Sequence, residues 1–158
     1  MIERGLSEDF DLNTLSKTPV TVYFCYPEDW KGWLAGCTAF LLGRSNSFVT
    51  HVCFKVGKNL QVDFNSQGVQ TYFSEYPVRP VSYSLIGVLR DKRVLSRVSA
   101  YEEAEHKFHW TSVLPTLWNN KCFFTHNPTC CSFTSHCLTG VDLHFDPDNL
   151  SKVLEALL

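Results

Sequence analysis

The chain has 158 residues and a formal net charge of −2, with 44% hydrophobic and 14% aromatic residues. This length and composition predict one domain with a well-filled core, and they exclude a disordered chain. The small net charge offers no basic face to a polyanion, so we expect no nucleic-acid partner.

Three further features point to the cytoplasm. Residues 1–4 lack the basic-then-apolar pattern of a secretion signal, and no apolar run reaches the ~18 residues that a membrane-spanning helix needs. The seven cysteines are an odd number, so they do not form a simple disulfide framework. We therefore expect a cytoplasmic protein with reduced thiols and no membrane span.

The sequence of the N-terminal part predicts an arm, a strand and a helix. Residues 1–18 are polar and predict a surface arm, which leaves residues 19–158 as a single domain. Residues 19–26 are β-branched and aromatic and predict a buried strand. Apolar residues then recur at three- and four-residue steps as far as Gly43, which indicates a helix with one apolar face. They are Trp30, Trp33, Leu34, Cys37, Phe40 and Leu41.

The middle of the chain predicts strands joined by short turns. The predicted strands are 48–56, 60–65, 69–73 and 81–89. Gly57, Lys58 and Asn59 form a tight hairpin turn between the first two strands, and a second turn at residues 66–68 leads to the third. Together these segments predict an antiparallel meander.

Helical patterns dominate the C-terminal part. One helix is predicted over residues 99–107, and apolar residues around Pro115 continue or follow it. Asp146 and Pro147 predict the start of a terminal helix with one apolar face. Its apolar residues are Leu150, Val153, Leu154 and Leu157. Strands followed by helices predict an α+β fold.

The segment between the last two predicted helices, residues 126–140, carries the strongest chemical signal. Asn127 is a good N-cap, Pro128 suits the first helical position and Gly140 suits a left-handed end. A helix of about three turns is therefore predicted. Cys130 would lie in its first turn, where unpaired N–H groups and the helix dipole favour a thiolate and could bind an oxyanion.

Two other interpretations of these cysteines are open. They also fit small buried apolar residues, which is what most cysteines are. A zinc site would draw on the crowded residues Cys122, His126, Cys130, Cys131, His136 and Cys137. Against zinc, the segment has no C-x-x-C pair, and His136 lies about 240° around the helix from Cys130.

A thiolate nucleophile needs a base, and the base needs an orienting acceptor. His51 and Asp63 lie twelve positions apart on the two strands of the predicted hairpin. Its register can bring His51 to the same face as Asp63 or Asn65, and either could hold one ring nitrogen while the other faces the thiol. A histidine in a strand is also common as a satisfied core residue, and an aspartate at a strand end is usually solvated.

Four segments carry a family resemblance: the helix KGWLAGCTAFLLGRSNSF, the strand opening THVCF, the acidic strand VDFN and the late helix CCSFTSHCLTG. Their order resembles the circularly permuted NlpC-type papain-like hydrolases, which include lecithin:retinol acyltransferase-like enzymes and small phage and bacterial relatives. The resemblance spans residues 30–155. It implies a permuted papain-like fold, in which an antiparallel meander or small barrel packs against helices and the nucleophilic cysteine begins a helix near the C-terminus.

The resemblance also implies roles for individual residues. Cys130 would be the nucleophile, His51 the base and Asp63 the orienting residue. The Cys130 thiolate would attack a carbonyl carbon, with His51 acting first as base and then as acid. Backbone N–H groups would bind the oxyanion, and water or an amine would resolve the thioester. No metal or organic cofactor is expected.

The sequence departs from the family pattern at two positions. Ser132 and Phe133 match the S-F of the phage-type pattern when Cys130 is the nucleophile, but many relatives place their cysteine directly before serine, which would select Cys131. Thr139 stands where relatives have glycine, which leaves the end of the helix open.

The implied function is that of a cysteine hydrolase of the peptidase or amidase type. The resemblance implies a phage- or bacterium-encoded protein, which would act in the host cytoplasm if a phage encodes it. Acyl transfer and thioester hydrolysis fit the same residues. Substrates in such families include peptide and isopeptide amides, peptidoglycan stem peptides and lipid esters, and the sequence does not choose among them. The alternative is a papain-like binding protein without turnover, such as a phage inhibitor of a host protein.

Overall fold

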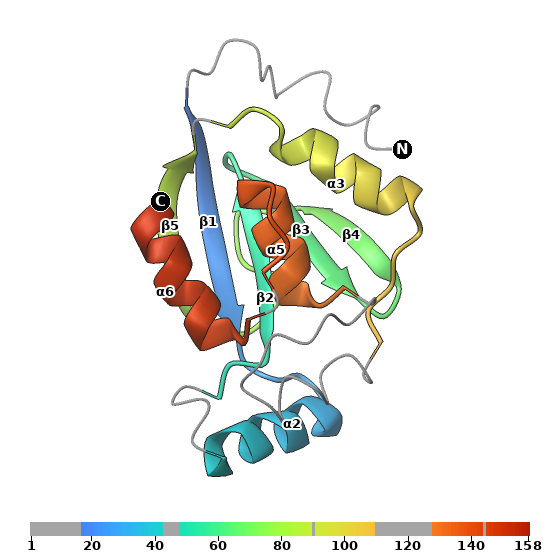
Figure 1. The fold of residues 1–158 in the computed structure, drawn as a ribbon, viewed down its shortest axis with the longest axis vertical. Coiled ribbons are helices and arrows are strands. Elements are labelled where there is room, and N and C mark those ends of the chain that lie inside the picture. Colours follow the sequence, from blue (N-terminus) through green and yellow to red (C-terminus); the bar gives the residue numbers. More distant parts are fainter. Residues whose placement is uncertain (1–16, 43–47, 90, 110–127, 144) are drawn as a thin grey trace.

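The structure, a computed structural model, describes residues 17–42, 48–89, 91–109, 128–143 and 145–158. These residues form an α+β fold with a five-stranded antiparallel sheet, as Figure 1 shows. The prediction of the α+β class is confirmed.

The sheet has the strand order β4-β3-β2-β1-β5, and all neighbours are antiparallel. The strands are β1 (Thr18–Cys25), β2 (His51–Val56), β3 (Leu60–Asn65), β4 (Gly68–Phe73) and β5 (Val81–Leu89). The predicted meander holds for β2, β3 and β4, but β5 pairs with β1 instead of β4. Among the described residues, β4 and β5 are therefore the edges of the sheet, and of the two expected forms, a meander or a small barrel, the described strands show the meander.

Strand β2 begins three residues later than predicted. Phe48 has a φ of 51°, in the left-handed region, so the extended backbone of the strand cannot include it. His51 is consequently the first residue of the strand and not a residue of its middle. Its ring lies at the end of the sheet.

Three helices pack on one face of the sheet (Figure 1). They are α3 (Val94–Glu103), α5 (Cys130–Thr139) and α6 (Pro147–Leu157). Alternate strand residues point toward them, and Phe54 and Phe64 are fully buried beneath Phe133 of α5. The ring centroids of Phe64 and Phe133 are 5.0 Å apart in a stacked arrangement. This aromatic contact holds α5 on β2 and β3.

The predicted bounds of α6 and α3 agree with the structure to different degrees. The predicted start of α6 is confirmed, since Asp146 is the N-cap and Pro147 the first helical residue. The predicted span 99–107 for α3 is wrong, because the helix begins at Val94 and ends at Glu103. Apolar residues at the true start supply its buried face, namely Val94, Leu95, Val98 and Tyr101.

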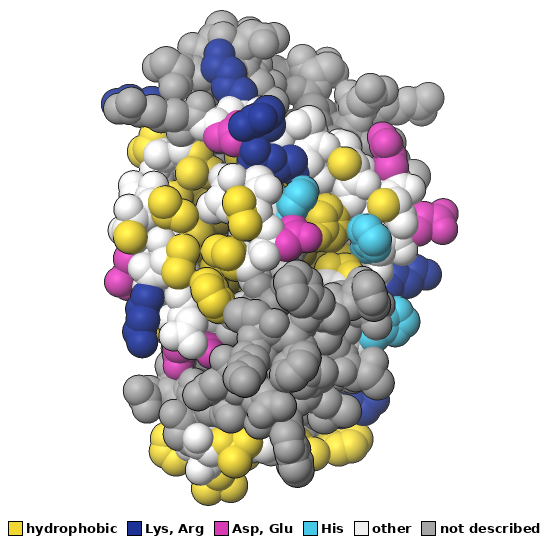
Figure 2. Space-filling view, in the orientation of Figure 1, with side chains coloured by type: hydrophobic (Ala, Val, Ile, Leu, Met, Phe, Trp, Pro, Cys, Tyr) yellow, Lys and Arg dark blue, Asp and Glu magenta, His cyan; other side chains and the backbone are white. Residues whose placement is uncertain are grey.

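Helix α2 (Trp30–Leu41) lies apart from the other helices, at the end of the sheet where β1 finishes and β2 begins (Figure 1). Its large apolar side chains face outward: Trp30 is 70% exposed and Leu41 is 82% exposed. Figure 2 shows apolar side chains gathered at this end of the molecule. The buried positions are Gly32 and Gly36.

Close approach of the backbone explains this orientation of α2. A Cβ atom on Gly36 would lie 3.2 Å from Cγ2 of Thr50, and one on Gly32 would lie 2.8 Å from Cβ of Pro27. Only glycine fits at the tighter of these contacts. The side of α2 that meets the protein is therefore its small side, and the apolar face predicted from the sequence is the outer one.

Several predictions fall on residues outside the described ranges. They concern most of the N-terminal arm, the apolar residues around Pro115, the zinc candidates Cys122 and His126, and Asn127. Thr18, assigned to the arm, is the first residue of β1. Within the described ranges, no helix has the length and hydrophobicity needed to cross a membrane.

Candidate active site

The cysteine helix α5 begins with a capping box. Thr129 is the N-cap: its side chain accepts a hydrogen bond from the N–H of Ser132, and the Ser132 hydroxyl accepts one from the N–H of Thr129. The predicted cap at Asn127 is therefore wrong, and Cys130 becomes the first helical residue. The reciprocal bonds satisfy two backbone donors and fix the first turn.

The predicted left-handed end at Gly140 is confirmed. Gly140 has a φ of 81° and its N–H donates to the carbonyl of His136. Thr139 remains within the helix and its hydroxyl donates to the carbonyl of Ser135 at 2.7 Å. Threonine at position 139 is thus compatible with the glycine stop that follows it.

Two backbone N–H groups at the start of α5 have no hydrogen-bond acceptor among the described residues. The N–H of Ser132 is capped, and that of Phe133 donates to the Thr129 carbonyl. The N–H groups of Cys130 and Cys131 have no acceptor among the described residues. They lie at the positive end of the helix dipole, where they can stabilise an anion.

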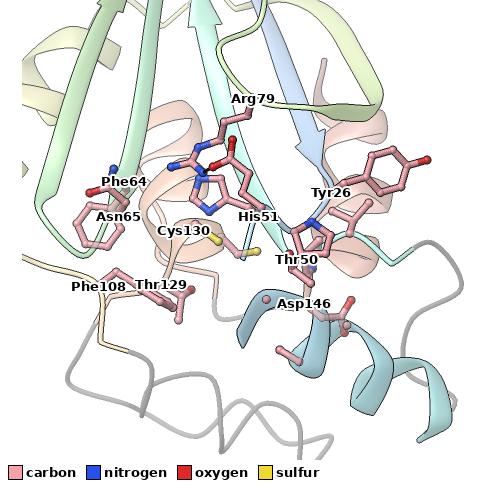
Figure 3. Close-up of a pocket in the computed structure, with 18 of the residues that line it drawn as sticks. Tyr26, Thr50, His51, Phe64, Asn65, Arg79, Phe108, Thr129, Cys130 and Asp146 are labelled. Atoms are coloured by element: carbon pink, nitrogen blue, oxygen red, sulfur yellow. Dashed lines mark hydrogen bonds and ion pairs between the residues drawn. The ribbon is translucent and has the colours of Figure 1, made fainter. Parts of the chain in front are cut away.

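Cys130 lies beside the ring of His51, as Figure 3 shows. A hydrogen bond with Cys131 holds the pKa of the Cys130 thiol well below its usual value, although burial acts to raise that pKa. The charge of His51 and a hydrogen bond from the N–H of Val52 lower the pKa further. The pKa of Cys131 is raised, by its hydrogen bond to Cys130 and by burial. Of the two adjacent thiols, Cys130 is the one that contacts the ring of His51, which favours its thiolate form.

His51 is held from its other side by Asp63. The distance from Nε2 of His51 to Oδ1 of Asp63 is 2.5 Å, which leaves Nδ1 as the ring nitrogen available to Cys130. Burial alone would disfavour the imidazolium, but the Cys130 thiolate and the bond to Asp63 raise the pKa of His51 to about 10. The side chain of His51 is 18% exposed and that of Asp63 is 1% exposed.

The hairpin register places both Asp63 and Asn65 on the face of His51, and the hydrogen bonds select Asp63 as the partner. Phe54 pairs with Val62 in the ladder, and Asp63 belongs to the same face of the sheet as His51, diagonally across from it. Asn65 is engaged elsewhere, because its Oδ1 accepts a hydrogen bond from the N–H of Gln67 at 2.8 Å. The alternative that the sequence left open is decided geometrically in favour of Asp63.

Arg79 completes the polar cluster and was not identified from the sequence. Its Nε and Nη2 lie 2.9 and 2.7 Å from Oδ2 of Asp63, and its Nη1 pairs with Glu28. Burial raises the pKa of Asp63, but His51 and Arg79 outweigh it and bring the value to about 2. The one sequence signal for such a cation was the carboxylate of Asp63 between Val62 and Phe64 in an apolar strand, because a buried charge requires a partner.

A cleft of about 310 Å³ opens onto Cys130 and His51. It lies between α2, the first turn of α5 and the ends of β2 and β3 (Figure 3). Cys130 is only 7% exposed, so the cleft is its route to a small molecule. The thiol of Cys130 and the imidazole of His51 thus line one space in which a carbonyl group could be attacked.

The structure also bears on the zinc interpretation. The ring of His136 pairs through Nδ1 with Asp142 at 2.6 Å, and Cys137 is fully buried. Over the described part of the chain, no three His, Cys, Asp or Glu side chains are grouped to hold a metal ion.

No protein family and no curated protein sequence matches the chain.

Proposed function

We propose that the protein is a cysteine hydrolase that acts through Cys130, His51 and Asp63. The observation that carries the proposal is the chain of contacts from the thiol of Cys130 through the ring of His51 to the buried carboxylate of Asp63, at the mouth of a cleft. A lowered thiol pKa, an oriented imidazole and access for a substrate are the requirements for a cysteine nucleophile.

The proposed reaction has two steps. The Cys130 thiolate attacks the carbonyl carbon of an ester, thioester or amide, and the N–H groups of Cys130 and Cys131 stabilise the oxyanion. The His51 imidazolium donates its proton to the leaving group as the bond to that group breaks, which leaves a thioester. His51 then takes a proton from water as the water attacks the thioester, and the acid and the thiolate are released.

The resemblance to the permuted NlpC-type hydrolases agrees with this proposal. The order of His51, Asp63 and Cys130 along the chain and the position of Cys130 at the start of a helix are what that family would require. Membership of that family and the permuted papain-like fold are part of the proposal. A phage or bacterial origin and a cytoplasmic location are further expectations of it.

Trapping of the acyl group tests the reaction. The protein is incubated with p-nitrophenyl esters and with aminoacyl coumarin amides, and intact-mass and peptide spectra are recorded during turnover. We expect product release together with an acyl adduct on Cys130. The Cys130→Ser variant should lose both signals, whereas Cys37→Ser, which removes an exposed thiol outside the cleft, should retain both.

A silent binding protein is the second candidate, because a fold and a cluster do not guarantee turnover. The same spectra separate the two functions. If no adduct forms on Cys130 and no product forms with any of these substrates, the hydrolase proposal is contradicted and the binding protein is favoured.

A further inference from the structure

The cleft continues from Cys130 along one side of α2. The α2 residues that line it have the smallest side chains: Gly32, Ala35, Gly36 and Ala39. They recur at steps of three and four residues, so they share one face of the helix. Val49, Phe108 and Phe145 line the cleft as well. This part of the cleft is therefore apolar.

The alanines and the glycines of this face have different roles. The glycines allow close contact with neighbouring segments, since a Cβ on either would touch Pro27 or Thr50. Ala35 and Ala39 are half-buried and lie one turn apart along the cleft. A larger side chain at either alanine would occupy the cleft, so these two residues determine its width.

The charges around the cleft disfavour an anionic ligand. Among the described lining residues, the cationic side chains are His51 and Arg79, and Arg79 forms ion pairs with Asp63 and Glu28. The carboxylates of Asp29 and Asp146 also line the cleft and cap the helices that follow them. Away from His51 and the first turn of α5, a carboxylate or phosphate on a ligand would meet the negative charge of Asp29 and Asp146, with no unpaired cation among the described lining residues.

The volume limits the size of the bound group. The cleft holds about 310 Å³, at the lower end of the range for small-molecule pockets. The space suits one short alkyl chain or one large apolar side chain.

We infer that the cleft along α2 binds an uncharged apolar group of the acyl substrate, and that Ala35 and Ala39 determine the size of that group. The inference rests on the proposed chemistry at Cys130, because the cleft selects a substrate by presenting it to that thiol. An alkyl chain and an apolar amino-acid side chain share the required chemistry, and the experiment distinguishes them.

Alkylation of Cys130 by a series of iodoacetyl reagents tests the inference. The series contains iodoacetamide, N-hexyl iodoacetamide, iodoacetyl-phenylalanine amide and iodoacetate, and each rate is divided by the rate of the same reagent with N-acetylcysteine. Peptide mapping assigns the label to Cys130. We expect at least one of the two apolar reagents to exceed iodoacetamide about tenfold in this ratio, and iodoacetate to fall below iodoacetamide. A larger ratio for the hexyl reagent identifies an alkyl chain, and a larger ratio for the phenylalanine reagent identifies a side chain.

Variants of α2 locate the preference. Ala35→Phe and Ala39→Phe should reduce the advantage of the apolar reagent over iodoacetamide to about twofold or less. Leu34→Phe is the matched control, because Leu34 neighbours Ala35 but is 60% exposed on the outer side of the helix. It should keep the advantage. Circular dichroism verifies that each variant is folded.

The outcomes separate this inference from the proposed function. A Cys130 that reacts fast with iodoacetamide but shows no advantage for either apolar reagent would overturn the inference alone, as would an advantage that survives both alanine substitutions in folded protein. A Cys130 no more reactive than N-acetylcysteine toward every reagent would overturn the proposed function, and this inference with it.

Discussion

Two pairs of neighbouring thiols lie near His51, and they differ in what surrounds them. Cys130 and Cys131 begin α5 at the mouth of the cleft. Cys25 and Cys53 lie across β1 and β2, with their sulfur atoms 3.9 Å apart, in a separate apolar cluster. Neither Cys25 nor Cys53 is among the described residues that line the cleft.

Both pairs contain one thiol with a lowered pKa. A hydrogen bond with Cys53 lowers the pKa of Cys25 while burial opposes it, and the same bond and burial raise the pKa of Cys53. The pKa of Cys130 is lowered in a similar way by Cys131. The comparison shows that a perturbed pKa does not identify a nucleophile by itself. Access and an oriented imidazole distinguish Cys130 from Cys25.

Removal of His51 should break this distinction most strongly. In His51→Ala the Cys130 thiolate loses the imidazolium, so its pKa should rise toward the usual range. Near pH 6 the rate of alkylation by iodoacetamide should fall, by at most about 10²-fold, because an ordinary thiol of pKa about 8.5 is mostly protonated there and the hydrogen bond with Cys131 still favours the thiolate. The rate measured from pH 4 to 10 gives the shift. His109→Ala, at an exposed histidine, is the control.

Turnover by the unmodified protein should also depend on His51 at high pH. The pKa of His51 is raised to about 10, so the imidazolium is present below that value and is lost as the pH rises through it. Because the first step needs this proton, kcat should decline above pH 10. A decline centred near the usual histidine value of about 6.5 would contradict the assignment of the imidazolium as the acid.

Asp63→Asn should affect stability as well as reactivity. The substitution removes the charge that pairs with Arg79 and His51, and breaking a buried pair typically costs about 3 to 5 kcal/mol in the free energy of unfolding. Because the pKa of Asp63 is lowered from 3.8 to about 2, its ionisation stabilises the native state above pH 4. That contribution is lost as the pH falls from 4 toward 2.

Urea unfolding between pH 6 and pH 2.5 measures both effects of Asp63→Asn. Asp142→Asn is the control, because the pair of Asp142 with His136 is half exposed and should contribute at most about 1 kcal/mol. Equal acid sensitivity of the native protein and of Asp63→Asn would show that Asp63 is not the group responsible.

The smallest effect is expected at the second thiol pair. Cys53→Ala removes one buried sulfur atom and should cost about 1 to 2 kcal/mol in the free energy of unfolding, with little change in the alkylation of Cys130. In the native protein Cys25 should remain unlabelled while Cys130 is labelled, as peptide mapping would show. Labelling of both at similar rates would remove the distinction between the pairs.

Local patterns predicted much of the fold. The bounds of β3 and β5, the helix at residues 30–41, the Gly140 stop and the start of α6 at Asp146 agree with the sequence. Each depends on alternation, periodicity or capping within a few residues. The predicted start of α5 was wrong by two residues because Asn127, Pro128 and Thr129 all carry helix-start signals. The hydroxyl of Ser132 selects Thr129 as the N-cap.

The sequence by itself determined the chemical inventory of the site: a cysteine at a helix start and a histidine and an aspartate on the two strands of a hairpin. Tertiary structure alone decided that Asp63 contacts His51 while Asn65 does not, that Arg79 joins them, and that α2 turns its small face toward the cleft. The physical reason is distance along the chain. Capping and hairpin pairing act between near neighbours, whereas ion pairs of buried groups and helix approach depend on segments that meet only after folding.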